Sequence, residues 1–178
     1  MTFDDLGKEG SQYIVPTNTP LYKDGRIFTA NGYGAGAFML QLNEDASGVR
    51  LLWRNKGFDP HHGCFVLVDG IIYGSSHGRN GLGKWMAVDW NTGRTRFEMN
   101  WGKGVGEGSV IAADGMLYCS DERRGMVGLV RVNPAKFDLV SFFRITRGEG
   151  AFWAHPVIHR GILYVRHGNA LMAYKIKG

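Results

Sequence analysis

The chain has 178 residues and a mass of 19.7 kDa, which fits one domain or two small ones. Its 27 glycines and 12% aromatic residues favour short strands joined by tight turns, and argue against a coiled coil or a helical bundle. The net charge is +5, but the basic residues are scattered, so the sequence gives little support to nucleic-acid binding. No stretch approaches the roughly 18 apolar residues that a membrane span needs, and residues 1–16 contain no apolar signal-peptide core.

A short turn motif recurs four times along the chain at a nearly constant spacing. Asp24-Gly25, Asp69-Gly70 and Asp114-Gly115 are spaced 45 residues apart, and Arg160-Gly161 follows 46 residues later. One residue after each of them comes a pair of an aliphatic and an aromatic residue. An Asp-Gly pair between apolar runs is typical of a two-residue hairpin turn, in which glycine supplies a positive φ. A period near 45 residues is typical of the four-stranded blade of a β-propeller.

The pattern of apolar runs and turns predicts further strands in chain order. They cover residues 38–42 and 49–53 in the first repeat, 64–68, 71–75, 84–90 and 94–100 in the second, 128–132 and 139–145 in the third, and 170–176 in the fourth. No segment of ten residues carries a helical stripe. The predicted fold class is therefore all-β, built from about four propeller blades of four antiparallel strands.

The repeat also predicts how the chain divides. An N-terminal extension covers residues 1–16, and the blades cover about residues 17–60, 61–105, 106–151 and 152–178. The fourth repeat ends after its third strand, and residues 13–15 are a candidate for the outer strand that would complete that blade.

Residues at equivalent positions of the repeat predict a ligand site. In a propeller, the loop leading into the first strand and the loop between the second and third strands of each blade reach one face. The loops before the first strands carry His61, His62, Glu107, Trp153 and His155, and the other loops carry Arg79, Arg123, Arg166 and His167, with His77 and Arg124 on the same face. These side chains would form a polar mouth with an aromatic platform.

Each of these residues also has a structural interpretation, and both remain open. Trp153 would stack on a planar ligand or fill the space between blades. Glu107 lies between two glycines and would bind a cation or act as a base, whereas the histidines and arginines would bind a ligand or serve only their own loops. Asp121 is a candidate acid, although a solvated loop charge is the favoured interpretation. Cys64 and Cys119 lack the spacing of a metal site and are interpreted as buried strand thiols.

One turn carries a family resemblance. The segment Ala87-Val88-Asp89-Trp90-Asn91-Thr92-Gly93 resembles the repeat of PQQ-like β-propellers, which pairs such a turn with an aromatic residue, usually tryptophan, in the outer strand. Phe97 takes that place here, and Trp53 lies near it in the first repeat. More narrowly, His61-His62-Gly63, Gly106-Glu107-Gly108 and Trp153-Ala154-His155-Pro156 resemble the C-terminal half of quinoprotein or polyvinyl-alcohol-dehydrogenase-like propellers.

The resemblance implies an incomplete ring, because such propellers usually have eight blades. The chain would then associate with a second copy or lack an N-terminal half, and the remaining alternative is that its four blades close a small ring alone. The resemblance also implies a periplasmic or secreted location.

For function, the resemblance implies a ligand-binding or scaffolding module. The first alternative is part of a quinoprotein dehydrogenase that oxidises an alcohol or sugar with PQQ, a planar molecule with three carboxylates, and Ca²⁺. The second alternative is a protein-interaction propeller. No catalytic residue and no metal ligand can be carried over from the family, and the pair of adjacent cysteines found in many PQQ alcohol dehydrogenases is missing.

Overall fold

The computed structural model describes residues 17–63, 65–78, 83–101 and 106–176, and all regular elements among them are β-strands. The first sheet contains β1 (Leu21–Lys23), β2 (Arg26–Ala30), β3 (Ala37–Leu42) and β4 (Val49–Asn55). The second contains β5 (Phe65–Val68), β6 (Ile71–Ser76), β7 (Lys84–Asp89) and β8 (Thr95–Met99), and the third contains β9 (Gly108–Ala113), β10 (Met116–Asp121), β11 (Met126–Arg131) and β12 (Asp138–Arg144). The fourth contains only β13 (Val157–His159), β14 (Ile162–His167) and β15 (Ala170–Lys175) among the described residues. Each sheet is an antiparallel meander in chain order. The all-β prediction is confirmed, and the predicted strands match the observed ones to within two residues at each end.

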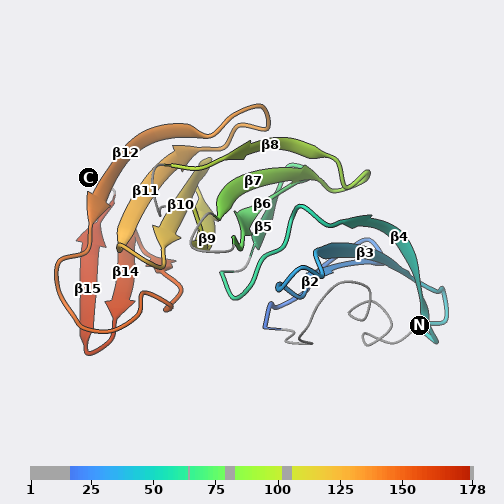
Figure 1. Ribbon diagram of the computed structural model, residues 1–178, viewed down its shortest axis with the longest axis horizontal. Helices are drawn as coiled ribbons and strands as arrows, with labels where there is room; N and C mark the ends of the chain where they lie inside the picture. The colour runs from blue at the N-terminus through green and yellow to red at the C-terminus, as the bar shows by residue number, and fades with distance from the viewer. Residues whose placement is uncertain (1–16, 64, 79–82, 102–105, 177–178) are drawn as a thin grey trace.

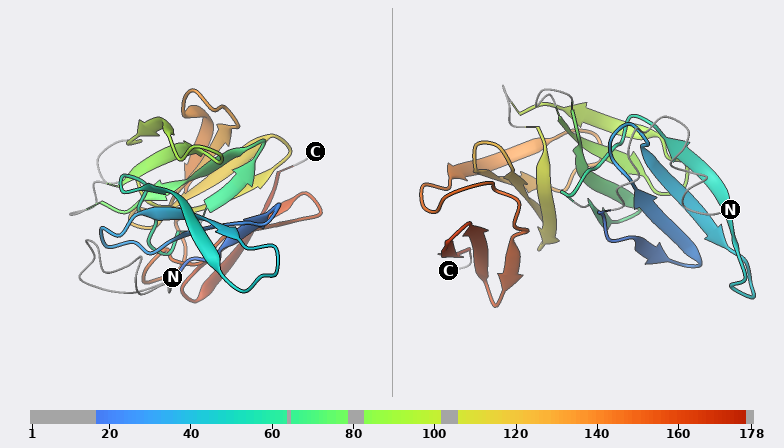
Figure 2. Two further views of the ribbon diagram at one scale, coloured as in Figure 1. Left: turned by 90° about the vertical axis from the view of Figure 1, so that its right-hand side faces the viewer. Right: turned by 60° about the horizontal axis from the view of Figure 1, so that its bottom comes forward.

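The four sheets follow one another along an arc, like successive blades of a propeller (Figure 1). The first and fourth sheets lie at opposite ends of this arc, and Figure 2 shows the sheets fanned out side by side. Among the described residues no helix is long and apolar enough to cross a membrane.

Four equivalent hairpin turns join the first two strands of the sheets. Asp24, Asp69, Asp114 and Arg160 all have φ between 47° and 51°, and the glycine after each has φ between 73° and 77°. Positive φ at both central residues defines the type I′ turn, whose twist matches that of the flanking strands. The predicted two-residue turn therefore forms in all four sheets, from Asp-Gly in the first three and from Arg160-Gly161 in the fourth.

The fourth turn leads to a first prediction, because Arg160 occupies a left-handed conformation that aspartate tolerates better. We expect Arg160→Asp to raise the free energy of unfolding by about 1 kcal/mol, as measured by urea denaturation. The matched reverse change, Asp69→Arg, should lower it by a similar amount. Equal stabilities of wild type and both variants would contradict this account.

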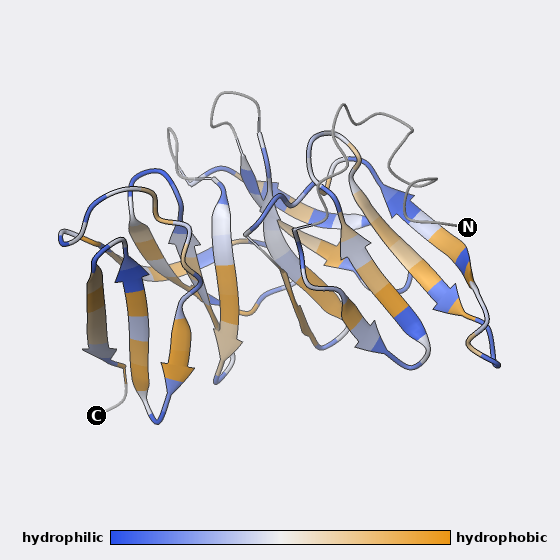
Figure 3. Ribbon diagram, turned by 90° about the horizontal axis from the view of Figure 1, so that it is seen from below, coloured by the Kyte–Doolittle hydropathy of each residue, from blue (hydrophilic) through white to orange (hydrophobic). Residues whose placement is uncertain are grey.

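The core lies between the sheets, and alternation along each strand divides it. In the second sheet, Ile72, Met86 and Val88 face the first sheet, whereas Tyr73 and Trp85 face the third. Apolar residues accordingly run along the strands, and polar residues gather at the loops (Figure 3). The inner sheets are thus buried on both faces.

The fourth sheet is packed on one face only. Ile158, Leu163 and Tyr174 are paired in register and pack against the third sheet. The opposite face, called here the outer face of the fourth sheet, carries Val157, Tyr164, Leu171 and Ala173. Val157 is 56% exposed and Leu171 is 70% exposed. Among the described residues, none covers the apolar side chains of this outer face at the end of the arc.

The first and second sheets are fastened together through the Thr-Gly turn. Trp53 donates a hydrogen bond from Nε1 to the Trp90 carbonyl oxygen at 3.1 Å. A Cβ at Gly93 would lie 2.5 Å from the Trp53 ring, so only glycine admits the indole here. Asp89 organises the turn by accepting hydrogen bonds from the backbone and hydroxyl of Thr92. Trp53 and Phe97 are equivalent in register, each opposite the residue before a β-bulge.

Candidate functional site

The candidate site lies on the face formed by the loops that lead into the first strands and the loops that follow the second strands. His61 and His62 precede β5, and Glu107 precedes β9. His77 follows β6, and Glu122 follows β10. These five residues are called here the histidine–glutamate cluster, and they come from the second and third sheets.

Backbone contacts fix the two sheets against each other at this cluster. Ser75 Oγ donates to the Gly108 carbonyl oxygen at 2.8 Å and accepts from the Gly108 N–H at 2.9 Å. The Glu122 N–H donates to the Glu107 carbonyl oxygen at 3.1 Å. The acidic side chains of the cluster are therefore held by the innermost strand of the third sheet and its neighbour.

Glu107 is the most buried charge of the cluster, with a side chain only 3% exposed. Its Oε1 accepts from Arg123 Nε at 2.5 Å. Its Oε2 accepts from the Gly78 N–H at 3.0 Å and lies 3.3 Å from His77 Nδ1. Burial opposes ionisation, but these hydrogen bonds outweigh it and lower the pKa of Glu107 to about 2. Glu107 is therefore a carboxylate at neutral pH.

Glu122 behaves in the opposite way. Its side chain is 12% exposed, and its Oε2 lies 3.2 Å from His62 Nε2. Burial, followed by the nearby charge of Glu107, raises the pKa of Glu122 to about 7. The hydrogen bond to Glu107 raises the pKa of His77 against the effect of its burial. The cluster thus contains one fixed carboxylate and one that readily takes up a proton.

Aromatic and imidazole rings form a continuous row across the site. Tyr33, after β2, packs edge-on against His61 with 4.5 Å between ring centroids. His61 contacts His62 at 4.7 Å, and His62 contacts Trp153 at 5.4 Å. These four residues are called here the aromatic row. It joins loops of the first, second and fourth sheets, and Trp153 remains 63% exposed.

The central imidazoles of the row are held neutral. Burial, followed by the charges of His62 and His77, lowers the pKa of His61 to about 4. Burial and His155 lower the pKa of His62, whose carbonyl oxygen lies 2.8 Å from His155 Nε2. The rings of the row meet edge-to-face, and the exposed Trp153 indole at its end is the ring on which a flat molecule can stack.

The structure brings together six of the nine residues singled out in the sequence: His61, His62, Glu107, Arg123, Trp153 and His155. His167 lies apart from them, where it stacks on Phe152 at 3.7 Å and bonds the carbonyl oxygens of Arg147 and Gly150. Arg166 donates to the Gly168 carbonyl oxygen. Arg79 lies outside the described residues.

Tyr33 and Glu122 contribute to the site but were not selected from the sequence, and His77 was placed on this face by its loop without being chosen as a ligand-binding residue. The repeat could have identified them. Glu122 follows His77 by 45 residues, as Glu107 follows His62, so two histidine–glutamate pairs occupy equivalent positions.

Two charges that the sequence placed in solvated or flexible loops are buried. Asp121 is 0% exposed and accepts a hydrogen bond from the Arg124 N–H, so the expectation of a solvated charge was wrong. Glu107 is covered by the Gly83 backbone, where a Cβ would lie 2.6 Å from its side chain. Cys119 is buried and free as expected, whereas Cys64 lies outside the described residues.

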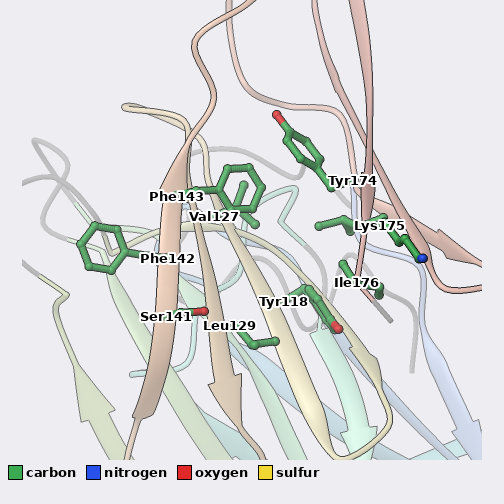
Figure 4. Close-up of a pocket in the computed structure, with 10 residues that line it drawn as sticks. Tyr118, Val127, Leu129, Ser141, Phe142, Phe143, Tyr174, Lys175 and Ile176 are labelled. Atoms are coloured by element: carbon green, nitrogen blue, oxygen red, sulfur yellow. The ribbon is translucent and has the colours of Figure 1, made fainter. Parts of the chain in front are cut away.

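A separate apolar cleft of about 310 Å³ lies between the third and fourth sheets (Figure 4). Tyr118, Phe143 and Tyr174 line it, beside the edge strand β15. It shares no residue with the histidine–glutamate cluster or the aromatic row.

Solved structures establish the architecture. The chain is similar to BamB from Moraxella catarrhalis, with a TM-score of 0.64, 16% identity, and coverage of 89% of this chain and 43% of that one. It is also similar to a putative 6-phosphogluconolactonase from Bacteroides fragilis, with a TM-score of 0.64, 13% identity, and coverage of 92% and 54%. A europium-containing methanol dehydrogenase matches with a TM-score of 0.50, 15% identity, and coverage of 80% and 28%.

These comparisons concern the fold alone, because the identities are low. No protein-family profile matches the sequence, and no curated protein matches it at a significant level. The chain spans about half or less of the length of the structures it resembles. The chain therefore has a β-propeller fold.

Proposed function

We propose that the chain is a ligand-binding part of a PQQ-like β-propeller and that the aromatic row receives a planar, anionic small molecule. The observation that carries the proposal is the exposure of Trp153 at the end of a row of packed rings. Loops of three sheets contribute to this row, so the rings are preorganised for a ligand. The Arg123 side chain, 42% exposed beside Glu107, supplies a cation for an acidic group of the ligand.

The family assignment within this proposal rests on the Thr-Gly turn. Trp53 docks on Gly93 of the following sheet, which brings together an outer-strand tryptophan and a Thr-Gly turn, the two features that the PQQ-like repeat pairs. The same resemblance supports a periplasmic or secreted location.

PQQ itself is a suitable probe, because it is planar and carries three carboxylates. The Ca²⁺ that accompanies it in dehydrogenases fits the described residues poorly. Calcium takes six to eight oxygen ligands, whereas the cluster offers imidazole nitrogens and two carboxylates. We therefore favour ligand binding over a dehydrogenase reaction carried out by this chain.

Calorimetric titration with PQQ, with and without Ca²⁺, tests the proposal. We expect binding to wild type and about tenfold weaker binding to Trp153→Ala, since one stacked aromatic contributes about 1.4 kcal/mol. Phe142→Ala is the matched control, because Phe142 is 59% exposed on β12 and belongs to neither cluster nor row. Equal affinities of the two variants would contradict a site at the aromatic row, and turnover of an alcohol with PQQ would favour the dehydrogenase instead.

We further propose that a second copy of the chain completes the ring. Four sheets along an arc, with an uncovered apolar face at one end, support this arrangement. Closed propellers pack every blade on two neighbours, which removes such faces.

A further inference from the structure

We propose that the histidine–glutamate cluster is a binding site for a divalent transition-metal ion, represented by Zn²⁺, with His77, Glu107 and Glu122 as ligands. Neither the planar ligand nor the completed ring is required for this inference. One donor atom from each of the three side chains lies within 4.8 Å of the others. The ligands come from two adjacent sheets, so the ion would bridge successive blades.

A small cavity coincides with these donors. Its volume is about 10 Å³, and its lining includes His61, His77, Glu107 and Glu122. This is room for about one water-sized particle. Polar side chains that surround a cavity of this size suit a single ion better than an organic group.

The donor spacing is close to that of a zinc site. Zinc binds nitrogen and oxygen at about 2.0–2.2 Å, which places tetrahedral ligands about 3.5 Å apart. His77 Nδ1 and Glu107 Oε2 are already separated by 3.3 Å. Rotation of the Glu122 carboxylate would close the remaining distance.

The neighbours of the ligands are arranged as a metal site requires. Arg123 binds Oε1 of Glu107, which fixes the carboxylate with Oε2 toward His77. Hydrogen bonds of this kind orient ligands and sustain their affinity for metal. His62 Nε2 is placed similarly at 3.2 Å from Glu122 Oε2. Three protein ligands leave a fourth position for water or a substrate atom beside His61.

The donor set determines the class of ion. One imidazole and two carboxylates suit Zn²⁺ and its first-row neighbours, whereas Ca²⁺ and Mg²⁺ prefer shells of oxygen alone. The ion would also neutralise the repulsion between Glu107 and Glu122. Among the described contacts, Arg123 pairs with Glu107, whereas Glu122 faces the imidazole of His62.

Calorimetry with Zn²⁺ on the full chain after EDTA treatment tests the inference, supported by the visible absorption of bound Co²⁺. We expect one ion per chain and at least 100-fold weaker binding to His77→Ala and to Glu122→Gln. His159→Ala is the matched control, because it removes an exposed imidazole of β13 outside the cluster.

The outcomes are distinct. Absence of Zn²⁺ binding to wild type overturns the inference. So does a loss of affinity in His159→Ala equal to that in His77→Ala, since binding would then be nonspecific. Thermal unfolding without metal shows whether each variant is folded, and Glu122→Gln, at a partly exposed position, keeps the test valid if His77→Ala does not fold.

Discussion

Replacing Gly63 with alanine is expected to lower the free energy of unfolding by about 3 kcal/mol or more. A Cβ at Gly63 would lie 2.0 Å from the carbonyl oxygen of Gly108, which belongs to the next sheet. The backbone cannot yield easily, because Gly108 is bonded through both its N–H and its carbonyl to Ser75 Oγ. Urea denaturation followed by circular dichroism measures the loss.

A second glycine separates lack of space from backbone strain. Gly70 has φ of 77°, and a Cβ there would meet no atom within 4 Å. Gly70→Ala should therefore cost only the strain of the left-handed conformation, about 1–2 kcal/mol. If Gly63→Ala costs no more than Gly70→Ala, the close approach of the second and third sheets does not determine stability.

The architecture could be predicted because local signals repeat. A type I′ turn requires positive φ at two successive residues, so Asp69-Gly70 and its equivalents mark each first hairpin. Alternation of apolar residues then gives strands of the right length on either side. Four copies at one period are typical of a repeat fold such as the propeller and argue against other fold classes.

The candidate site could be predicted only in part. Equivalent repeat positions correctly brought Glu107 near Arg123, and His62 near Trp153. His167 also follows a second strand, but its ring stacks on Phe152 within its own loops. The sequence gives the loop to which a residue belongs, whereas the direction of the side chain depends on neighbours from other blades.

Burial of the acidic residues was the main feature hidden from the sequence. The segment Gly106-Glu107-Gly108 predicts a flexible loop, because glycine is common in exposed turns. Here these glycines allow close packing: a Cβ at Gly106 would collide with the Gly83 backbone. Asp121 ends a strand and is buried by the same convergence of loops. Such packing arises only when the second and third sheets meet.

The second large effect is expected at the outer face of the fourth sheet. If two copies close one ring, this face packs on the first sheet of the other copy, and light scattering should give a mass near twice 19.7 kDa. Exposed Tyr22 and Leu51 belong to the first sheet and offer apolar surface for that contact. Val157→Glu should then yield monomers, because Val157 is paired in register with Tyr164 rather than with a cation, and a buried unpaired carboxylate costs about 3 kcal/mol, or more than 100-fold in affinity.

Val140→Glu provides the matched control for this change. Val140 is 48% exposed on β12, the outer strand of the third sheet, and does not lie on an end face of the arc. It should leave the mass near twice 19.7 kDa. A wild-type mass of 19.7 kDa would contradict closure by a second copy. Equal dissociation of both variants would place the contact elsewhere, because a ring of two half-rings must bury the end sheets and leaves the outer strands in solvent.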